Sequence, residues 1–247
     1  MSDSGIRSAG FCMEPIARIH SCYGEKFGIP RQPGLSPSAR AQLEILPPFD
    51  REEAFRGIEQ FSHLWILFLF HGNGPREFSP TVRPPRLGGN KRLGVFATRS
   101  PFRPNPLGLS VVRFEGLSRR GGRLMLEVGG GDFLDGTPVI DIKPYIPYAD
   151  APEGATGGFA EVQPEARLEL EWSDEAMGVL EALPQPERER FMALAGETLR
   201  LDPRPAYIRD DRSFACALDG WDLQWRIEQE RVRVLRLERL NGRLVSS

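Results

Sequence analysis

The sequence feature that most restricts the fold is an uninterrupted apolar run at residues 64–70. Seven apolar residues match the length of a strand and fall far short of a membrane-spanning helix. Alternation along residues 62–70 puts apolar side chains on both faces of such a strand. Residues 72–75, Gly-Asn-Gly-Pro, then break it. We therefore predict a central strand that the rest of the domain covers on both sides.

Other short segments with β-type patterns follow one another through the first 150 residues. They are expected at residues 15–21, 42–46, 93–98, 108–117, 123–128 and 139–143. Residues 50–61 are expected to form a short helix, because Asp50 and Glu53 have the spacing of a capping box. Many short strands with regular turns favour a mainly β fold, either a barrel or a sandwich.

A second region, with helical as well as β-type patterns, follows a stretch rich in small residues. Ser173 is placed to cap one helix, and Pro186 suits the first turn of another. Asp219 and Gly220 predict a tight hairpin turn. Strands are expected at residues 166–172, 214–218, 221–227 and 231–240. The predicted order is a disordered start at residues 1–12, a β domain at 13–150, a linker at 151–163 and a smaller α+β domain at 164–247.

The composition is that of a soluble globular protein, with 40% hydrophobic and 27% charged residues among 247. The first ten residues lack the apolar core of a secretory signal. The three cysteines, Cys12, Cys22 and Cys216, show no C-x-x-C spacing, which argues against a disulfide framework and a zinc site. A cytoplasmic, reducing location is expected, with no membrane attachment and no metal.

Charge is distributed unevenly, although the formal net charge is only −2. Residues 76–113 contain one acidic residue, Glu77, and eight basic ones. The basic residues are Arg76, Arg83, Arg86, Lys91, Arg92, Arg99, Arg103 and Arg113. This asymmetry predicts a side of the molecule that faces a polyanion, and solvated loop charge is the alternative interpretation.

Several common catalytic signatures are absent from the sequence. There is no G-x-G-x-x-G loop after a strand, no P-loop, no H-E-x-x-H and no G-x-S-x-G. The common dehydrogenase, nucleotide hydrolase and hydrolase classes are therefore disfavoured.

A proline-stiffened loop at residues 98–108 is the strongest candidate for a binding site. Its prolines at positions 101, 104 and 106 fix their own φ and keep their predecessors out of the helical region. Arg99 and Arg103 carry planar guanidinium forks that suit carboxylate or phosphate. A rigid frame with forked cations predicts an anionic ligand, and a plain crossover loop with surface arginines is the alternative.

Four further motifs are weaker candidates. The Pro-Gly pair at residues 33–34 suits a type II turn that exposes backbone groups, and His71 ends the apolar strand. Asp135 begins an Asp-Gly-Thr-Pro turn, and its carboxylate can accept hydrogen bonds from ribose hydroxyls. Arg204 and Tyr207 follow a proline-rich step and can contact phosphate and stack on a base. Each motif also has a structural interpretation, as a turn, a core histidine or a rigid loop.

Several long, proline-punctuated motifs resemble those of the bacterial tRNA methyltransferases that act on N6-threonylcarbamoyladenosine, the TsaA-like or VirR-like family. That nucleoside lies at tRNA position 37, next to the anticodon. The motifs lie at residues 23–34, 61–71, 80–89, 94–108, 135–145 and 202–207. The resemblance is strong over residues 15–148 and looser through the C-terminal domain.

The resemblance implies a small antiparallel β-barrel that binds S-adenosylmethionine, followed by a smaller α+β domain. It also implies tRNA as the partner and a homodimer with the S-adenosylmethionine site near the subunit interface. Carried over by motif, the positions that bind S-adenosylmethionine are Gln32, Pro33, Gly34, His71, Gly72, Arg99, Leu109, Asp135, Gly136, Thr137 and Pro138.

The same resemblance implies methyl transfer to the N6 atom of the nucleoside. Arg103, Asn105 and Arg204 are candidates for binding phosphate or the threonyl carboxylate, and Tyr207 is a candidate for contact with RNA. Candidates for removing a proton from the acceptor nitrogen are Asp135, Asp141 and Tyr207. An RNA-binding module without catalysis and a methyltransferase for a small molecule are the competing interpretations.

Overall fold

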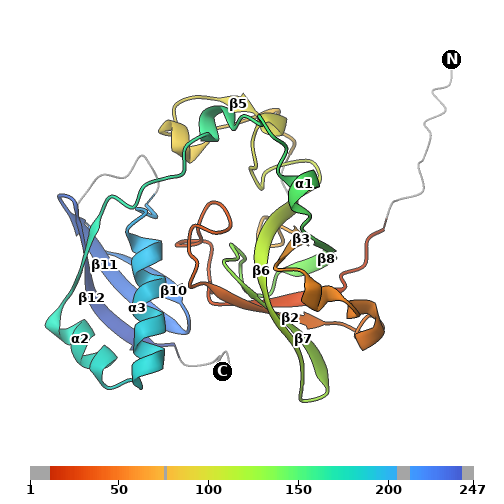
Figure 1. Ribbon diagram of the computed structural model, residues 1–247. Coiled ribbons are helices and arrows are strands. Elements are labelled where there is room, and N and C mark those ends of the chain that lie inside the picture. Colours follow the sequence, from red (N-terminus) through yellow and green to blue (C-terminus); the bar gives the residue numbers. More distant parts are fainter. Residues whose placement is uncertain (1–11, 75–76, 205–211, 241–247) are drawn as a thin grey trace.

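The first half of the chain forms a closed, six-stranded antiparallel barrel (Figure 1). The structure is a computed structural model that describes residues 12–74, 77–204 and 212–240. Around the barrel the strands follow the order β1-β2-β7-β6-β3-β8. Their bounds are Ala17–Ser21 (β1), Arg40–Ile45 (β2), His63–Leu69 (β3), Leu107–Arg120 (β6), Arg123–Gly129 (β7) and Pro138–Pro144 (β8). The predicted mainly β fold with a small barrel is confirmed, and of the predicted disordered start only Cys12 lies within the described residues.

The apolar run forms β3, which pairs with β6 on one side and β8 on the other. Leu64, Ile66 and Phe68 point into the barrel and are buried. The opposite face is only half-buried, so the prediction that both faces are covered was wrong for that face. A closed barrel covers one face of each strand, and the outer face of β3 instead borders the cleft described below.

Two predicted elements of the barrel domain differ from the structure. Residues 50–61 form two short 3₁₀ helices, Glu52–Phe55 and Ile58–Gln60, neither with a side-chain cap. Gly57 separates them with a left-handed φ of 92°, which an α-helix cannot contain. Residues 93–98 form a two-residue strand, β5 (Leu93–Gly94), followed by a 3₁₀ turn. The strand is short because its only strand partner among the described residues is β4 (Thr81–Val82), which also has two residues.

The C-terminal half builds a four-stranded sheet in the order β10-β11-β12-β9, covered by two helices. The strands are Phe214–Leu218 (β10), Trp221–Glu228 (β11), Arg231–Arg239 (β12) and Glu169–Trp172 (β9), and the helices are Asp174–Glu181 (α2) and Gln185–Leu199 (α3). Ser173 caps α2 as predicted, since its Oγ accepts from the Ala176 N–H at 3.1 Å. Pro186 lies in the first turn of α3, also as predicted.

Residues 22–39, here called the shared segment, leave the barrel between β1 and β2 and enter the core of the C-terminal domain. Phe27 stacks on the buried Trp225 with ring centroids 6.0 Å apart. Tyr23 is buried and forms isolated β-bridges to Leu134 on the barrel side and Leu218 in β10. The two halves are therefore joined by common core packing as well as by the chain between them.

A carboxylate on α3 fixes the far end of the shared segment. Glu197 accepts hydrogen bonds from Ser36 Oγ at 2.9 Å, Ser38 N at 2.8 Å and Ser38 Oγ at 2.8 Å. Hydrogen bonds to an ionised acceptor are stronger than neutral ones. This clamp orders the segment next to residues 30–34, the loop that the sequence predicts as part of a binding site.

Two connecting stretches, between β3 and β6 and between the two halves, complete the molecule. Residues 73–106 leave the barrel after β3 and carry β4 and β5, which lie above the space between the two halves in Figure 1. Residues 151–163 connect the halves and are exposed. In the described part of the chain, no helix has the length and apolar character needed to cross a membrane.

Replacing Glu197 with Gln is expected to lower the free energy of unfolding by about 1–3 kcal/mol, because an amide nitrogen cannot accept the bonds that one carboxylate oxygen accepts now. Urea unfolding measures the change. Glu181→Gln on the exposed side of α2 is the matched control and should leave stability within about 0.5 kcal/mol of the parent. Equal stability of both variants would show that the clamp contributes nothing.

Candidate functional site

A cleft of about 3150 Å³ lies between the barrel, the shared segment, residues 73–106, the connecting residues and the end of α3. Its lining is strongly cationic, with nine Lys or Arg against four Asp or Glu. The basic residues are Lys26, Arg31, Arg83, Arg86, Arg92, Arg99, Arg103, Arg167 and Arg204, and the acidic ones are Glu77, Asp132, Glu161 and Asp202. Five of the eight basic residues singled out in the sequence line this cleft, and Arg76 lies outside the described residues.

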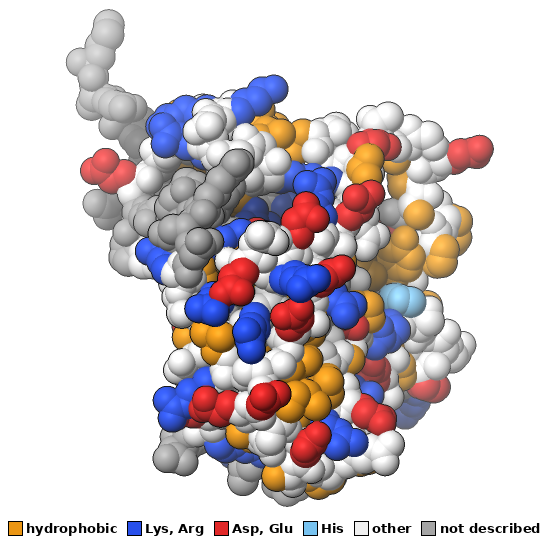
Figure 2. Space-filling view, turned by 90° about the vertical axis from the view of Figure 1, so that its left-hand side faces the viewer, with side chains coloured by type: hydrophobic (Ala, Val, Ile, Leu, Met, Phe, Trp, Pro, Cys, Tyr) orange, Lys and Arg blue, Asp and Glu red, His pale blue; other side chains and the backbone are white. Residues whose placement is uncertain are grey.

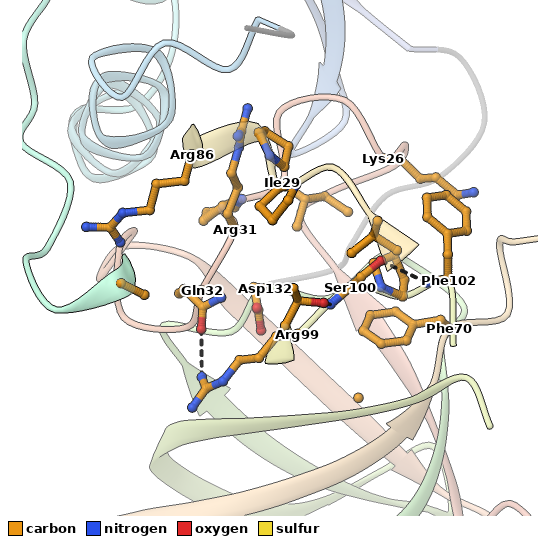
Figure 3. A pocket seen from close by; sticks show the side chains of 18 of the residues that line it. Lys26, Ile29, Arg31, Gln32, Phe70, Arg86, Arg99, Ser100, Phe102 and Asp132 are labelled. Atoms are coloured by element: carbon orange, nitrogen blue, oxygen red, sulfur yellow. Dashed lines mark hydrogen bonds between the residues drawn. The ribbon is translucent and has the colours of Figure 1, made fainter. Parts of the chain in front are cut away.

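The proline-stiffened loop reaches across the cleft to the shared segment. Arg99 Nη1 donates to Gln32 Oε1 at 2.6 Å, as Figure 3 shows. These two residues are 67 positions apart in sequence. The structure thus brings together two of the residues that the resemblance assigns to one ligand.

The other polar residues of this loop behave differently. Arg103 Nη1 donates to the Thr98 carbonyl at 3.2 Å, which braces the loop from within while Arg103 still lines the cleft. Asn105 is exposed and is not among the residues that line the cleft. Leu109 lines the cleft with its side chain half exposed, on the outer face of β6.

The Pro-Gly pair presents open backbone to the cleft. Gly34 has a left-handed φ of 78°, which suits the third position of a type II turn. Its N–H donates to the Gly130 carbonyl at 2.8 Å. A Cβ atom added at Gly34 would meet nothing within 4 Å, so this face of the turn is accessible to a ligand.

A carboxylate that the sequence analysis missed lies in the wall of the cleft. Asp132 follows three glycines at the end of β7, and its Oδ1 accepts from Ser110 Oγ at 2.6 Å. Burial raises the pKa of Asp132 to about 6, against the lowering effects of the Ser110 hydrogen bond and of the Arg99 charge. The signal in the sequence was an acidic residue directly after a glycine run at a strand end.

The end of β3 meets the Asp-Gly-Thr-Pro turn. Thr137 Oγ1 and His71 Nδ1 are 3.3 Å apart, and Thr137 Oγ1 also donates to the Leu134 carbonyl at 2.6 Å. Lys26, which the sequence analysis did not select, binds the Gly72 carbonyl through its ammonium group. His71, Gly72 and Thr137 all line the cleft, whereas Gly136 and Pro138 are not among the lining residues.

Two carboxylates that the sequence analysis nominated for proton removal have structural partners. Asp135 Oδ1 accepts from the Ser21 N–H at 3.1 Å and so ties the turn to β1. Asp141 pairs with Lys143 at 2.9 Å on the outer wall of β8. Neither residue is among those that line the cleft.

The second proline-held arginine lies where the C-terminal domain borders the cleft. Arg204 forms two hydrogen bonds with Asp202, at 2.8 and 2.9 Å, and its carbonyl accepts from Arg31 of the shared segment at 3.5 Å. Asp202 has a left-handed φ of 51°. Tyr207, the remaining predicted contact, lies outside the described residues.

Comparison with known proteins identifies the family of this chain. Residues 18–151 match the model of the tRNA-methyltransferase O N-terminal domain, and residues 165–240 match that of the TrmO C-terminal domain. The chain belongs to the tRNA-methyltransferase O family.

Individual relatives match between about two thirds and nearly all of the chain. The tRNA (adenine(37)-N6)-methyltransferase of Escherichia coli K12 is 42% identical over 235 residues, which span 93% of this chain and 99% of the relative. The enzyme of the same name from Eikenella corrodens is 49% identical over 68% of this chain and 92% of its own length. A crystal structure of TrmO from P. aeruginosa superposes with a TM-score of 0.76 at 42% identity, covering 95% of this chain and 99% of that one.

The outer side of the C-terminal domain has a different charge pattern from the cleft. Figure 2 looks onto this side and shows basic and acidic side chains interspersed. Arg231 pairs with Glu169 at 3.0 Å and with Glu171 at 3.1 Å, and Arg236 pairs with Glu175 at 3.3 Å. The excess of basic over acidic residues in the cleft lining therefore contrasts with the paired charges on this side of the family member.

Among the residues that the structure describes, no group of three or more His, Cys, Asp or Glu is arranged to hold a metal ion. The three cysteines are free thiols, with Cys22 and Cys216 buried in the C-terminal core.

The raised pKa of Asp132 predicts an effect on stability. Its pKa is about 6 in the folded protein, against an ordinary value of 3.8 for an aspartate, so between these pH values the folded state holds a proton that the unfolded chain has released. The ionised carboxylate therefore destabilises the fold progressively as the pH rises through that interval, and fully above it.

Asp132→Asn is expected to increase the free energy of unfolding at pH 7.5 by about 1–3 kcal/mol, since the amide oxygen can still accept from Ser110. The gain should vanish below pH 4. Urea unfolding at both pH values tests this, with Glu153→Gln in the exposed connecting stretch as the control. A variant that is less stable at pH 7.5 would contradict the expectation.

Proposed function

We propose that this protein transfers a methyl group from S-adenosylmethionine to the N6 atom of adenine 37 in tRNA, and that its substrate carries the threonylcarbamoyl group there. The observation that carries the proposal is the Arg99–Gln32 pair, which closes a cationic cleft in a chain of the tRNA-methyltransferase O family. The adenine-37 activity is that of the relatives named above. The threonylcarbamoyl group comes from the motif resemblance.

The groups around the Arg99–Gln32 pair fit S-adenosylmethionine. The guanidinium fork of Arg99 suits the carboxylate of its methionine part. The open turn at Gly34 offers backbone groups, and Phe70 and Leu134 provide apolar surface for the adenine. Bound there, S-adenosylmethionine would supply an electrophilic methyl group on a sulfonium. The other residues that we propose to form or support this site are Gln32, Pro33, Gly34, His71, Gly72, Leu109, Asp135, Gly136, Thr137 and Pro138.

The cationic lining supports RNA as the second substrate. Phosphate groups are bound by clusters of Lys and Arg, and a modified base outside a helix can enter a cleft. Arg103 and Arg204 line the cleft from opposite domains and are proposed to bind phosphate or the threonyl carboxylate. Asn105 and Tyr207 are proposed to contact RNA. The residues' main task is to align the acceptor nitrogen with the methyl carbon.

We further propose a homodimer in the cytoplasm, with the domain limits 13–150 and 164–247. Two separate hydrophobic clusters support two units, with the shared segment of the first unit packing into the cluster of the second. Phe96 and Leu109 beside the cleft are 73% and 51% exposed, and such apolar side chains commonly mark an interface. Sedimentation equilibrium tests the dimer, which a monomer at every protein concentration measured would rule out.

The activity is tested by incubating the full chain with methyl-labelled S-adenosylmethionine and tRNA that carries or lacks the threonylcarbamoyl group. Label is expected in the nucleoside from the modified tRNA alone. Steep salt dependence of tRNA binding with no label on either RNA would instead indicate an RNA-binding module. Label on a free nucleoside or metabolite without any need for tRNA would indicate a small-molecule methyltransferase.

Arg99→Ala is expected to weaken S-adenosylmethionine binding about 10-fold or more, because a charge-assisted hydrogen bond is lost. Isothermal titration calorimetry measures the affinity. Arg233→Ala, an exposed arginine of β12 that does not line the cleft, is the matched control. An unchanged affinity for Arg99→Ala would remove Arg99 from the site while leaving the proposed reaction in place.

A further inference from the structure

We propose that Asp132 is a catalytic residue whose carboxylate accepts the proton that leaves the acceptor nitrogen during methyl transfer, and that Ser110 positions it. This inference rests on the proposed function. Neither residue was selected from the sequence, and neither is one of the S-adenosylmethionine positions implied by the family motifs.

Ser110 holds one carboxylate oxygen of Asp132 at the wall of the cleft. Ser110 Oγ donates to Oδ1 at 2.6 Å, and Ser110 itself is buried in the wall of β6. Asp132 lines the cleft, so Oδ2 can meet a group bound there. Figure 3 draws Asp132 beside the Gln32–Arg99 pair, where the methyl donor is proposed to bind. The carboxylate is thus held at the place where the two substrates must meet.

The other acidic residues that line the cleft are less suited to accept a proton. Asp202 forms an ion pair with Arg204 at 2.8 Å, and Glu161 accepts from the Gly157 N–H. Glu77 is exposed on the outer stretch of residues 73–106. Among the described acidic residues that line the cleft, Asp132 is the one with a pKa raised toward neutrality.

The reaction needs such an acceptor, because the nitrogen is flanked by a purine and a carbonyl and is weakly nucleophilic. The nitrogen forms its bond to the methyl carbon as the bond from that carbon to sulfur breaks, and sulfur keeps the electron pair. The N–H proton passes to Asp132 Oδ2. The carboxylate becomes a neutral acid, the positive sulfonium becomes a neutral thioether, and charge and atoms balance.

The surroundings of Asp132 favour a base that works near neutral pH. Burial raises its pKa to about 6, while the Ser110 hydrogen bond and the Arg99 charge oppose the rise. Arg99 is the charged side chain among the described residues that acts on it, and the neutral Ser110 is its hydrogen-bond partner. A base with a pKa just below the working pH is ionised yet still strong enough to take a proton.

The test uses the full chain with Asp132→Asn, which keeps the shape and the acceptor for Ser110. At pH 7.5 and saturating substrates, kcat is expected to fall about 100-fold or more, within the usual range for a general base. The affinity for S-adenosylmethionine, measured by calorimetry, should stay within threefold of the parent (about 0.6 kcal/mol). Loss of affinity with unchanged kcat would overturn the proposal and make Asp132 a ligand for the donor's ammonium group.

Ser110→Ala separates a catalytic role from a structural one. In the parent, kcat is expected to fall as the pH drops through about 6, where Asp132 becomes protonated. Removing the hydrogen bond that favours the ionised form raises that pKa, so the acidic limb of the profile should move to higher pH. An acidic limb that stays in place in Ser110→Ala would overturn the assignment.

A second readout does not depend on activity. Carbon-13 NMR of protein labelled at the Asp carboxyl carbons, without donor or RNA, should show one resonance titrating near pH 6. It should be absent in Asp132→Asn and shifted to higher pH in Ser110→Ala. If no such resonance exists, Asp132 is not the base.

Matched carboxylate variants complete the design. Glu153→Gln, away from the cleft, should keep the parent kcat and pH profile. If Asp135→Asn or Asp141→Asn abolishes the acidic limb while Asp132→Asn retains it, the base is that residue instead. Failure of the parent protein to methylate tRNA would refute the proposed function itself, whereas a parent-like Asp132→Asn would refute only this inference.

Discussion

The packing of the shared segment, which lies between two barrel strands, into the hydrophobic core of the C-terminal domain is the constraint on which the rest of the structure depends. Tyr23 bridges strands of both halves, and Phe27 lies against Trp225 at the centre of the C-terminal domain. Burying aromatic side chains of this size stabilises the junction by several kcal/mol on the usual area scale (roughly 2–3 kcal/mol for each ring). Glu197 then fixes the end of the segment through three hydrogen bonds.

The loop at residues 30–34, which we propose to bind S-adenosylmethionine, is positioned by this junction. Residues 30–34 lie between the aromatic anchor and the Glu197 clamp, so the C-terminal domain holds them as firmly as the barrel does. Across the cleft, prolines restrict the loop that carries Arg99. The Arg99–Gln32 hydrogen bond therefore joins two segments that are each ordered before a ligand arrives, which reduces the entropy lost on binding.

The fold raises the pKa of Asp132 above that of an exposed aspartate. Its burial at the end of β7 disfavours the ionised form, and Ser110 and Arg99 restore part of the balance. The fold bears this cost in stability at neutral pH. Such a cost is typical of sites where a shifted pKa serves chemistry, and it contrasts with the satisfied ion pairs on the outside of the C-terminal domain.

The sequence by itself determined the strands, the Ser173 cap, the Asp219-Gly220 turn and, through its motifs, the family, because these depend on local patterns. It failed at residues 50–61 and 93–98, where partners and a left-handed Gly57 override local preference. Only the tertiary structure decided that residues 22–39 pack into the core of the C-terminal domain and that Asp132 meets Ser110 and Arg99. The first set of contacts joins residues far apart in sequence, such as Phe27 and Trp225, and the second set accompanies a burial that raises the pKa of Asp132; no local pattern encodes either.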